Sequence, residues 1–110
     1  MNADQAMQRV TIVTPTLNAG RHLDACIASV RACGEELAAD GLDVRHVVID
    51  AGSTDNSLEV VASRQAGLDA GQLELHAEPG IGRAAALNRG MQLAGGGLVG
   101  WLDADDVYQP

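Results

Sequence analysis

Three aspartates stand within four residues near the end of the chain: Asp103, Asp105 and Asp106. They follow directly on an apolar run, residues 98–102, which fits a buried strand. A hard divalent cation such as Mg²⁺ or Mn²⁺ takes one or two carboxylates and completes its shell with water and substrate phosphates. An acidic run taken alone is more often a solvated turn. Its place at a strand end here predicts a metal site formed by Asp105 and Asp103, with a phosphate group as the third party.

The rest of the chain contains the elements that would position such a site. Apolar runs at residues 10–14, 44–49, 73–76 and 98–102 alternate with helical patterns at 21–39, from 55 or 56 to 67, and at 82–94. This alternation predicts an α/β fold in which a mostly parallel four-stranded sheet carries helices on both faces. At 110 residues the chain is long enough for a single domain with one core.

The helical spacing also predicts which side chains face the sheet. These are Leu23, Cys26, Ile27, Val30 and Leu37 of the first helix, Leu58, Val61 and Ala62 of the second, and Ala84, Leu87 and Met91 of the third. Cys26 and Cys33 are seven residues apart on one helix, beyond the reach of a disulfide, so both are expected to be reduced.

Each predicted strand is followed by residues that can bind a ligand. In chain order these segments are residues 15–18, 50–55, 78–83 and 103–106. Ligands of open parallel sheets bind beyond the carboxyl ends of the strands, and right-handed crossovers bring all four segments to that edge. Four polar segments at one edge predict a binding site.

The types of side chain suggest how the site would be divided. Ser53 offers a hydroxyl and an amide at a helix start, and Asp50 offers an acceptor for a ribose hydroxyl or a base N–H. Asp55 has two readings, a ligand group or a cap of the second helix. Arg83 opens the third helix, where its guanidinium and the helix dipole would both favour a diphosphate.

Two other nucleotide-related folds compete with this interpretation. Residues 80–85 spell G-x-G-x-x-A, the dinucleotide fingerprint, which would make the chain an NAD-type module of an oxidoreductase. That fingerprint normally leaves its strand at the first glycine, whereas Glu78 and Pro79 intervene here. A receiver-type phosphoacceptor domain needs an acidic pair after the first strand and a lysine, but the chain has Thr14 and Pro15 there and contains no lysine.

Four segments taken together, residues 10–18, 47–55, 80–90 and 102–106, resemble the family 2 glycosyltransferases. The resemblance implies a three-layer, Rossmann-like GT-A half with strand order 3-2-1-4. It implies that the first loop, with Pro15 and Asn18, and the Asp50 loop hold the nucleoside of a nucleotide-sugar donor. It further implies that Asp103 faces the ribose, that Asp105 ligates Mg²⁺ or Mn²⁺ on the donor diphosphate, and that Arg83 lies near the donor.

The chain departs from the family pattern at two places. Family members commonly carry a second acid before Gly-Ser, and this chain has Ala51 there, so a UDP-sugar is only the default donor. Inverting members carry their general base in an acceptor-binding half, and this chain ends at Pro110. We therefore expect residues 1–110 to form the nucleotide-sugar-binding domain of a glycosyltransferase, truncated before the half that contains the catalytic base.

Composition narrows the class of partner and the compartment. Fifteen acids against seven arginines give a formal charge of −8, which disfavours nucleic acid and anionic membranes. No apolar segment long enough for a membrane span or a signal peptide occurs, which predicts a cytoplasmic protein, reaching the inner face of the membrane only through missing regions. The resemblance implies a glycan or lipid-linked acceptor, and an uncovered sheet edge predicts self-association. A non-catalytic domain that merely retains the fold is the remaining alternative.

Overall fold

The alternation of strands and helices expected from the sequence is present throughout the chain. The computed structural model describes residues 8–66, 68, 71–95 and 97–104. Its elements are β1 (Gln8–Thr16), α1 (Gly20–Ala38), β2 (Leu42–Asp50), α2 (Ser57–Gln65), β3 (Leu73–Ala77), α3 (Arg83–Ala94) and β4 (Leu98–Trp101). Strands β1 and β2 are longer than the apolar runs that predicted them, residues 10–14 and 44–49. Residues before these runs still pair with each other, for example Gln8 with Leu42.

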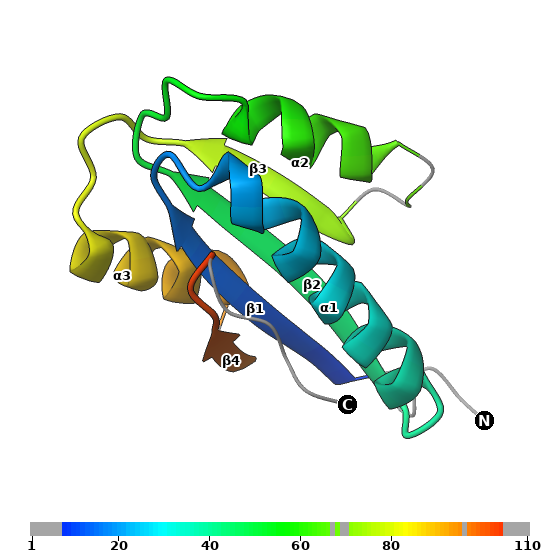
Figure 1. Cartoon of the computed structure of the whole chain (residues 1–110). Coiled ribbons are helices and arrows are strands. Elements are labelled where there is room, and N and C mark those ends of the chain that lie inside the picture. The colour runs from blue at the N-terminus through cyan, green and yellow to red at the C-terminus, as the bar shows by residue number, and fades with distance from the viewer. Residues whose placement is uncertain (1–7, 67, 69–70, 96, 105–110) are drawn as a thin grey trace.

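The four strands form one sheet in the order β3-β2-β1-β4, and every pair is parallel. The expected order 3-2-1-4 is therefore confirmed. Val13 of the central strand β1 pairs with Val47 of β2 on one side and with Trp101 of β4 on the other. The carboxyl ends of β1, β2 and β3 consequently meet at one edge of the sheet, at the upper left of Figure 1.

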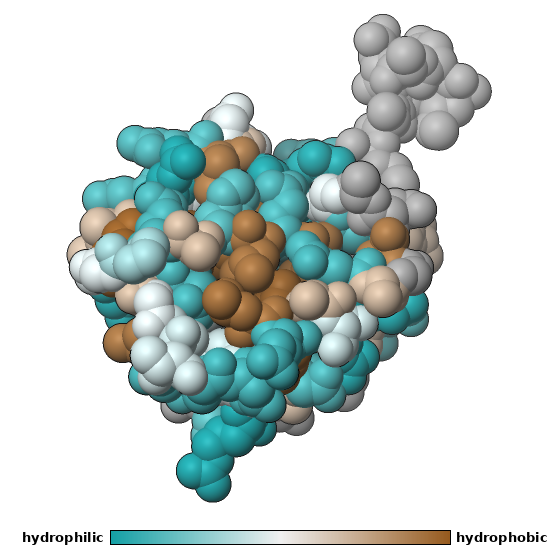
Figure 2. Space-filling view, turned by 90° about the horizontal axis from the view of Figure 1, so that it is seen from above, coloured by the Kyte–Doolittle hydropathy of each residue, from teal (hydrophilic) through white to brown (hydrophobic). Residues whose placement is uncertain are grey.

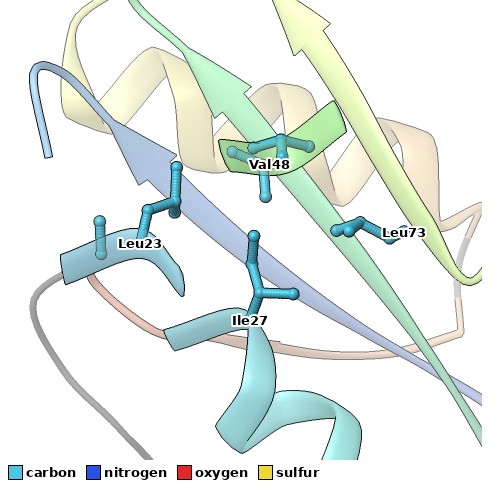
Figure 3. Packing of buried hydrophobic residues seen from close by; sticks show 6 residues of the cluster. Leu23, Ile27, Val48 and Leu73 are labelled. Atoms are coloured by element: carbon cyan, nitrogen blue, oxygen red, sulfur yellow. The ribbon is translucent and has the colours of Figure 1, made fainter. Parts of the chain in front are cut away.

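Helices α1 and α2 cover one face of the sheet, and α3 covers the other (Figure 1). On the first face, Leu23 and Ile27 of α1 pack against Val48 of β2 and Leu73 of β3, with Val61 of α2 in the same cluster. Figure 3 shows Leu23 and Ile27 pointing from α1 towards these strands. The predicted inward face of α1 is confirmed, since Cys26 and Val30 are also buried.

The buried faces of α2 and α3 agree with the predicted ones only in part, since Val61 of α2 is buried and Leu87 of α3 packs against the core as predicted. In α2, Ser57 and Val61 are buried, whereas Leu58 is 38% exposed, because the helix starts at Ser57 and its hydroxyl is held by Asp55. In α3, Ala86 and Gly90 are buried and Met91 is 49% exposed.

The reason in α3 is a close approach of its backbone to β1. A Cβ on Gly90 would lie 2.4 Å from both methyl carbons of Val13, so only glycine lets the helix sit at this distance. The helix therefore packs its small residues Ala86 and Gly90 against the sheet. A search for large apolar residues at helical spacing does not detect such a face.

Polar residues cover the part of the sheet that α3 leaves open. Arg45 of β2 forms an ion pair with Glu74 of β3 and donates from Nη1 to the carbonyl of Leu93 at 2.7 Å, near the end of α3. The hydrogen bond from Arg45 lowers the pKa of Glu74. This contact fastens the carboxyl end of α3 to the sheet.

Apolar surface remains on the molecule. Viewed from above, a central apolar patch is surrounded by mainly hydrophilic residues (Figure 2). On the edge strand β4, Leu98 and Trp101 are each 52% exposed. None of the described helices combines the length and apolarity that a membrane span requires.

Candidate functional site

A hollow of about 340 Å³ opens where the strands end. All four strand-end segments contribute to its wall, together with the first turns of α3. Its lining consists of Pro15, Thr16, Leu17, Ile49, Ala51, Ile81, Gly82, Arg83, Ala86 and Asp103. Most of these side chains are apolar, and the charged groups are confined to Arg83 and Asp103. A mostly apolar wall with a few placed polar groups is typical of small-molecule sites.

Asn18 joins the loop after β1 to the loop after β2. Its Oδ1 accepts hydrogen bonds from the backbone N–H groups of Thr54 at 2.8 Å and Asp55 at 3.2 Å, and its own N–H donates to Ser53 Oγ at 2.9 Å. Asn18 has a φ of 52°, a left-handed conformation that asparagine adopts more readily than most residues. The polar groups of Asn18 and Ser53 thus face each other, and both residues fix the relative position of the two loops.

Asp50 organises the second loop from within. Its carboxylate accepts from the N–H groups of Gly52 at 3.0 Å and Ser53 at 2.8 Å, and from the Ser53 hydroxyl. The residue is 1% exposed and does not line the hollow. Its predicted contact with the nucleoside stays a prediction. In the structure the carboxylate accepts hydrogen bonds from donors of its own loop.

Asp55 caps both helices that flank the two loops. It accepts from the N–H of Gly20 at 3.0 Å, at the start of α1, and from the N–H of Ser57 at 2.9 Å, at the start of α2. The Ser57 hydroxyl, followed by the Gly20 N–H, lowers the pKa of the Asp55 carboxyl. Of the two readings of Asp55, the structure supports the cap.

The third loop is attached to the second through the backbone. The N–H of Glu78 donates to the carbonyl of Asp50 at 2.8 Å, and the N–H of Gly80 donates to the carbonyl of Ala51 at 2.9 Å. Gly52 has a φ of 110°, a conformation that disfavours any side chain, and its position lies in van der Waals range of Pro79. Three of the four loops therefore form one connected unit.

Arg83 and Asp103 face each other at one end of the hollow. Nε and Nη2 of Arg83 donate to Oδ1 of Asp103 at 3.1 and 3.0 Å, and Nη2 also lies 3.2 Å from Oδ2. The side chains are 59% and 42% exposed. Both predicted site residues are thus in the hollow, each holding the other, and both remain accessible to solvent.

A short buried polar chain lies beneath the site. The hydroxyl of Thr14 is 2.7 Å from Nε2 of His46 and 3.9 Å from Sγ of Cys26, and that thiol donates to the carbonyl of Asp103 at 3.9 Å. Burial lowers the pKa of His46 to about 4, so the ring is neutral at pH 7. Neither Cys26 nor Cys33 takes part in a disulfide within the described part of the chain, as expected from their spacing.

Some predicted residues fall outside the site and some were missed. Asp105, the predicted metal ligand, and Asp106 lie outside the described residues. Thr16 was not predicted, yet its hydroxyl is buried at the hollow without a partner among the described residues. Its place immediately after Pro15 at the end of β1 was the available signal. Ile49, Ile81 and Ala86 were also missed as lining residues, because apolar side chains at strand ends look like ordinary core.

A second hollow, of about 280 Å³, lies between α1 and the amino-terminal parts of β2 and β3. Its wall is mainly apolar, and its acidic side chains are engaged in ion pairs, Glu35 with Arg31 and Asp43 with Arg9. It faces away from the strand ends, so the site of interest is the hollow that holds Arg83 and Asp103.

The topology separates the dinucleotide alternative from the nucleotide-sugar one. In dinucleotide-binding folds the glycine fingerprint follows the central strand, at the point where the strand order reverses. Here residues 80–85 follow β3, which lies at the edge of the sheet, and β1 is central. The crossover from β3 through α3 to β4 spans the whole sheet. The fingerprint match is therefore in the wrong place for that function.

An open parallel sheet with a ligand-sized hollow at the carboxyl ends of its strands is typical of α/β domains that bind small molecules. The sequence model of glycosyl transferase family 2 matches residues 11–110. The chain belongs to this family.

Individual relatives agree with the assignment. The chain is 32% identical over 102 residues to an uncharacterized glycosyltransferase of Nostoc sp., covering 93% of this chain and 30% of that protein. It is 35% identical over 98 residues to a PGL/p-HBAD biosynthesis glycosyltransferase of Mycobacterium bovis, covering 87% of this chain and 35% of that protein. The chain spans about a third of the length of these relatives.

Solved structures confirm the fold. The mannosyltransferase PcManGT from Pyrobaculum calidifontis, in complex with GDP-Man and Mn²⁺, has a TM-score of 0.77 at 28% identity and is matched over 94% of this chain and 29% of its own. Glucosyl-3-phosphoglycerate synthase from Mycobacterium tuberculosis, at 23% identity, has a TM-score of 0.59 over 88% of this chain and 33% of its own. The three-layer GT-A half expected from the sequence is the observed architecture.

Proposed function

We propose that this chain is the donor-binding domain of a glycosyltransferase, which transfers a sugar from a nucleotide-diphospho-sugar to an acceptor hydroxyl. The observation that carries the proposal is the hollow built by all four strand ends, with Arg83 and Asp103 at one end, in a member of glycosyl transferase family 2. Its volume of about 340 Å³ is in the range of small-ligand sites.

The lining divides the hollow between the parts of a donor. Ile49, Ala51 and Ile81 offer apolar surface for a nucleobase. Arg83, at the first residue of α3, offers a guanidinium for the diphosphate, and the unpartnered hydroxyl of Thr16 offers one further hydrogen bond. Of the remaining predicted donor residues, Pro15 lines the hollow, and Asn18, Asp50 and Ser53 hold the loops around it in place.

A divalent cation fits the charged end of the hollow. Asp103 is the one carboxylate among the lining residues, and 42% exposure leaves its oxygens within reach of a ligand. Among the described residues no group of three or more potential ligand side chains converges, and Asp103 is the carboxylate that these residues place at the hollow, while Asp105, the other proposed ligand, lies outside them. Mg²⁺ and Mn²⁺ are commonly held by one or two carboxylates with phosphates and water, and PcManGT was solved with Mn²⁺. Such an ion would offset the charge that develops on the leaving diphosphate.

The base of the donor is a separate question. Ala51 lines the hollow and has no side-chain acceptor for a base N–H. PcManGT was solved with GDP-Man, so a guanosine donor competes with the uridine default. We expect weak discrimination between the two, because one missing hydrogen bond to a base costs about 1 to 3 kcal/mol.

Other parts of the activity belong to the same proposal. Inversion at the sugar and a glycan or lipid-linked acceptor follow from the family resemblance, whereas a cytoplasmic location is inferred from the lack of a long apolar segment in the sequence. Because residues 1–110 span only about a third of the length of the relatives they match, these residues by themselves are expected to transfer no sugar.

Calorimetry tests the donor-binding function. UDP, GDP and NAD are titrated into the chain with Mn²⁺ and again with EDTA. Binding of UDP or GDP that is strengthened by Mn²⁺, and reduced in an Asp103→Asn variant, supports the proposal. Metal-independent binding of NAD would favour the oxidoreductase alternative, and binding of none of the three would favour a domain that retains only the fold. Replacing Ala51 with Asp shows whether this position reads the base: an unchanged ratio of UDP to GDP affinity would mean that it does not.

The exposed edge of the sheet supports a second, physical expectation. Leu98 and Trp101 are half exposed on β4, whose outer edge pairs with no described strand. We propose that the isolated chain self-associates through this edge. Light scattering should show dimers or larger species that Leu98→Lys dissociates, whereas a monomer at high concentration would contradict it.

A further inference from the structure

Arg83 and Asp103 are the two charged residues of the hollow, and both would be needed to bind a donor. In the structure they bind each other instead. Arg83 is suited to a diphosphate and Asp103 to a cation, yet the guanidinium makes three contacts of 3.0 to 3.2 Å with that carboxylate. A cation approaching Asp103 therefore meets a fixed positive charge already in position. The diphosphate, in turn, would need Arg83 to turn towards it.

The pair is built to exchange partners more readily than the other acid-containing networks of the site. Its side chains are 59% and 42% exposed, and surface pairs of this kind contribute little to stability. Asp50, by contrast, is 1% exposed and held by three donors. A Cβ on Gly82, the residue before Arg83, would meet nothing within 4 Å, so there is open space beside the arginine.

An anionic ligand, the alternative partner for Arg83, could bind at the start of α3, beside Thr16. Helix α3 begins at Arg83 with no side-chain cap and no acid in its first turn, so its N–H groups and dipole favour an anion. The buried hydroxyl of Thr16, without a partner among the described residues, lines the same hollow. Two independent features thus point to a polar ligand at the position to which Arg83 would turn.

We propose, on the basis of the donor-binding function above, that Arg83 is a latch on Asp103. In the empty site the guanidinium occupies the carboxylate and holds off divalent cations. When a nucleoside diphosphate arrives, Arg83 exchanges Asp103 for the phosphates, and the freed carboxylate takes the metal ion. Metal and nucleotide therefore bind in a coupled manner, and the metal alone binds poorly.

The coupling has a reciprocal form that can be measured. If the nucleotide raises the affinity for Mn²⁺ by some factor, Mn²⁺ must raise the affinity for the nucleotide by the same factor. Part of this factor comes from direct contact between metal and phosphate, and the latch adds to it. Removing the positive charge of Arg83 should therefore strengthen binding of Mn²⁺ alone, by about tenfold for one positive charge a few ångströms from a doubly charged ion in water. A residue that merely supports Asp103 would give the opposite result.

The experiment measures Mn²⁺ binding without nucleotide, from the loss of the free-ion signal in electron paramagnetic resonance. It compares the wild-type chain with Arg83→Gln and with Arg89→Gln, a matched arginine on α3 that pairs with Glu78. We expect tighter Mn²⁺ binding in Arg83→Gln, loss of that gain when Asp103→Asn is added, and no change in Arg89→Gln. Arg83→Lys keeps the charge and should stay close to wild type. Circular dichroism confirms that each variant is folded.

Calorimetry with GDP and UDP completes the test. In Arg83→Gln the factor by which Mn²⁺ raises nucleotide affinity should shrink. Unchanged, weaker or undetectable Mn²⁺ binding by folded Arg83→Gln would overturn the latch. If neither nucleotide binds the wild-type chain, the donor-binding proposal fails, while the comparison of Mn²⁺ affinities still decides whether Arg83 masks Asp103.

Discussion

The two sides of the hollow are built on different physical principles. On the side of β1 and β2, Asn18, Asp50 and Asp55 each accept at least two hydrogen bonds, and together they tie two loops and two helix starts into one unit. On the side of α3 and β4, one exposed ion pair joins Arg83 to Asp103. The first side is preorganised before any ligand arrives. The second keeps its charged groups available for exchange.

For Asp50 the difference follows from burial, whereas Asn18 and Asp55 are exposed and are held by their hydrogen bonds. A carboxylate enclosed in a loop must be satisfied by fixed donors, because an unpaired buried charge is very costly. Once satisfied, such a carboxylate stabilises the conformation of its loop. Separating an exposed ion pair costs little free energy, because water solvates both charged groups afterwards. The side that shapes the nucleoside site is therefore expected to govern stability, and the other side is expected to govern binding.

Removing the Asp50 carboxylate should give the largest loss of stability. Asp50→Ala leaves three donors of residues 52 and 53 without their acceptor. At about 1 kcal/mol or more for each unpaired donor, we expect a loss of about 3 kcal/mol in the free energy of unfolding. Urea denaturation measures it. Asp50→Asn, which keeps one acceptor oxygen, should fall between the two, and an Asp50→Ala chain as stable as wild type would mean that the loop is not organised by this residue.

Lowering the pH should reduce the free energy of unfolding, because the buried ring of His46 becomes protonated more readily in the unfolded chain. Because burial lowers the pKa of His46 to about 4, the unfolded chain, with a pKa near 6.5, binds more protons between these values. The contribution of the neutral His46 ring to the free energy of unfolding is therefore complete above about pH 6.5. It is lost as the pH falls towards 4, by at most about 3 kcal/mol. Asp55 and Glu74, whose pKa values are lowered, lose their contributions at still lower pH.

The measurement is the free energy of unfolding in urea from pH 7 to pH 4.5. His46→Gln should flatten this profile, even though it also loses stability at pH 7. His22→Gln, at an exposed position on α1, serves as the matched control. An equally steep profile in His46→Gln would assign the acid sensitivity to other groups.

Gly90→Ala tests how closely α3, and with it Arg83, must sit against the sheet. The new methyl group would overlap both methyl carbons of Val13, and overpacking of this kind costs about 1 to 3 kcal/mol. The better helix propensity of alanine returns up to about 1 kcal/mol. We expect a net loss of about 1 kcal/mol in chemical denaturation. The Val13→Ala background should reduce that loss, and Gly82→Ala, which meets no neighbour, should not share it.

Much of the fold could be predicted because local and global signals agree. Alternating apolar runs and helical patterns gave all seven elements, and the family resemblance gave the strand order. The buried faces of α2 and α3 could be found in this way only in part, through Val61 and Leu87. Gly90 is buried because the helix backbone touches Val13, and Ser57 because Asp55 binds it, whereas hydrophobic periodicity assigns both positions to the outside.

The site was predictable in its location and less so in the roles of its residues. Polar residues after parallel strands had to converge, and Arg83 and Asp103 do meet in the hollow. The sequence does not reveal that the acceptors of Asn18 and Asp50 are used by neighbouring loops, because that depends on partners 2 to 37 residues away. The same carboxylate or amide can serve a ligand or a loop, and only the geometry distinguishes them.

The smallest effect on stability is expected at the ion pair, and it is the sharpest test of the comparison. Arg83→Gln and Asp103→Asn should each change the free energy of unfolding by less than about 1 kcal/mol, because both side chains are largely solvated. A double-mutant cycle should give a coupling of about 0.2 to 1 kcal/mol, and salt should reduce it. A coupling near that of a buried pair, about 3 kcal/mol or more, would show that this side is as rigid as the other. Stability near wild type in these variants, together with the altered Mn²⁺ binding expected above, would separate the group that binds from the groups that hold the fold.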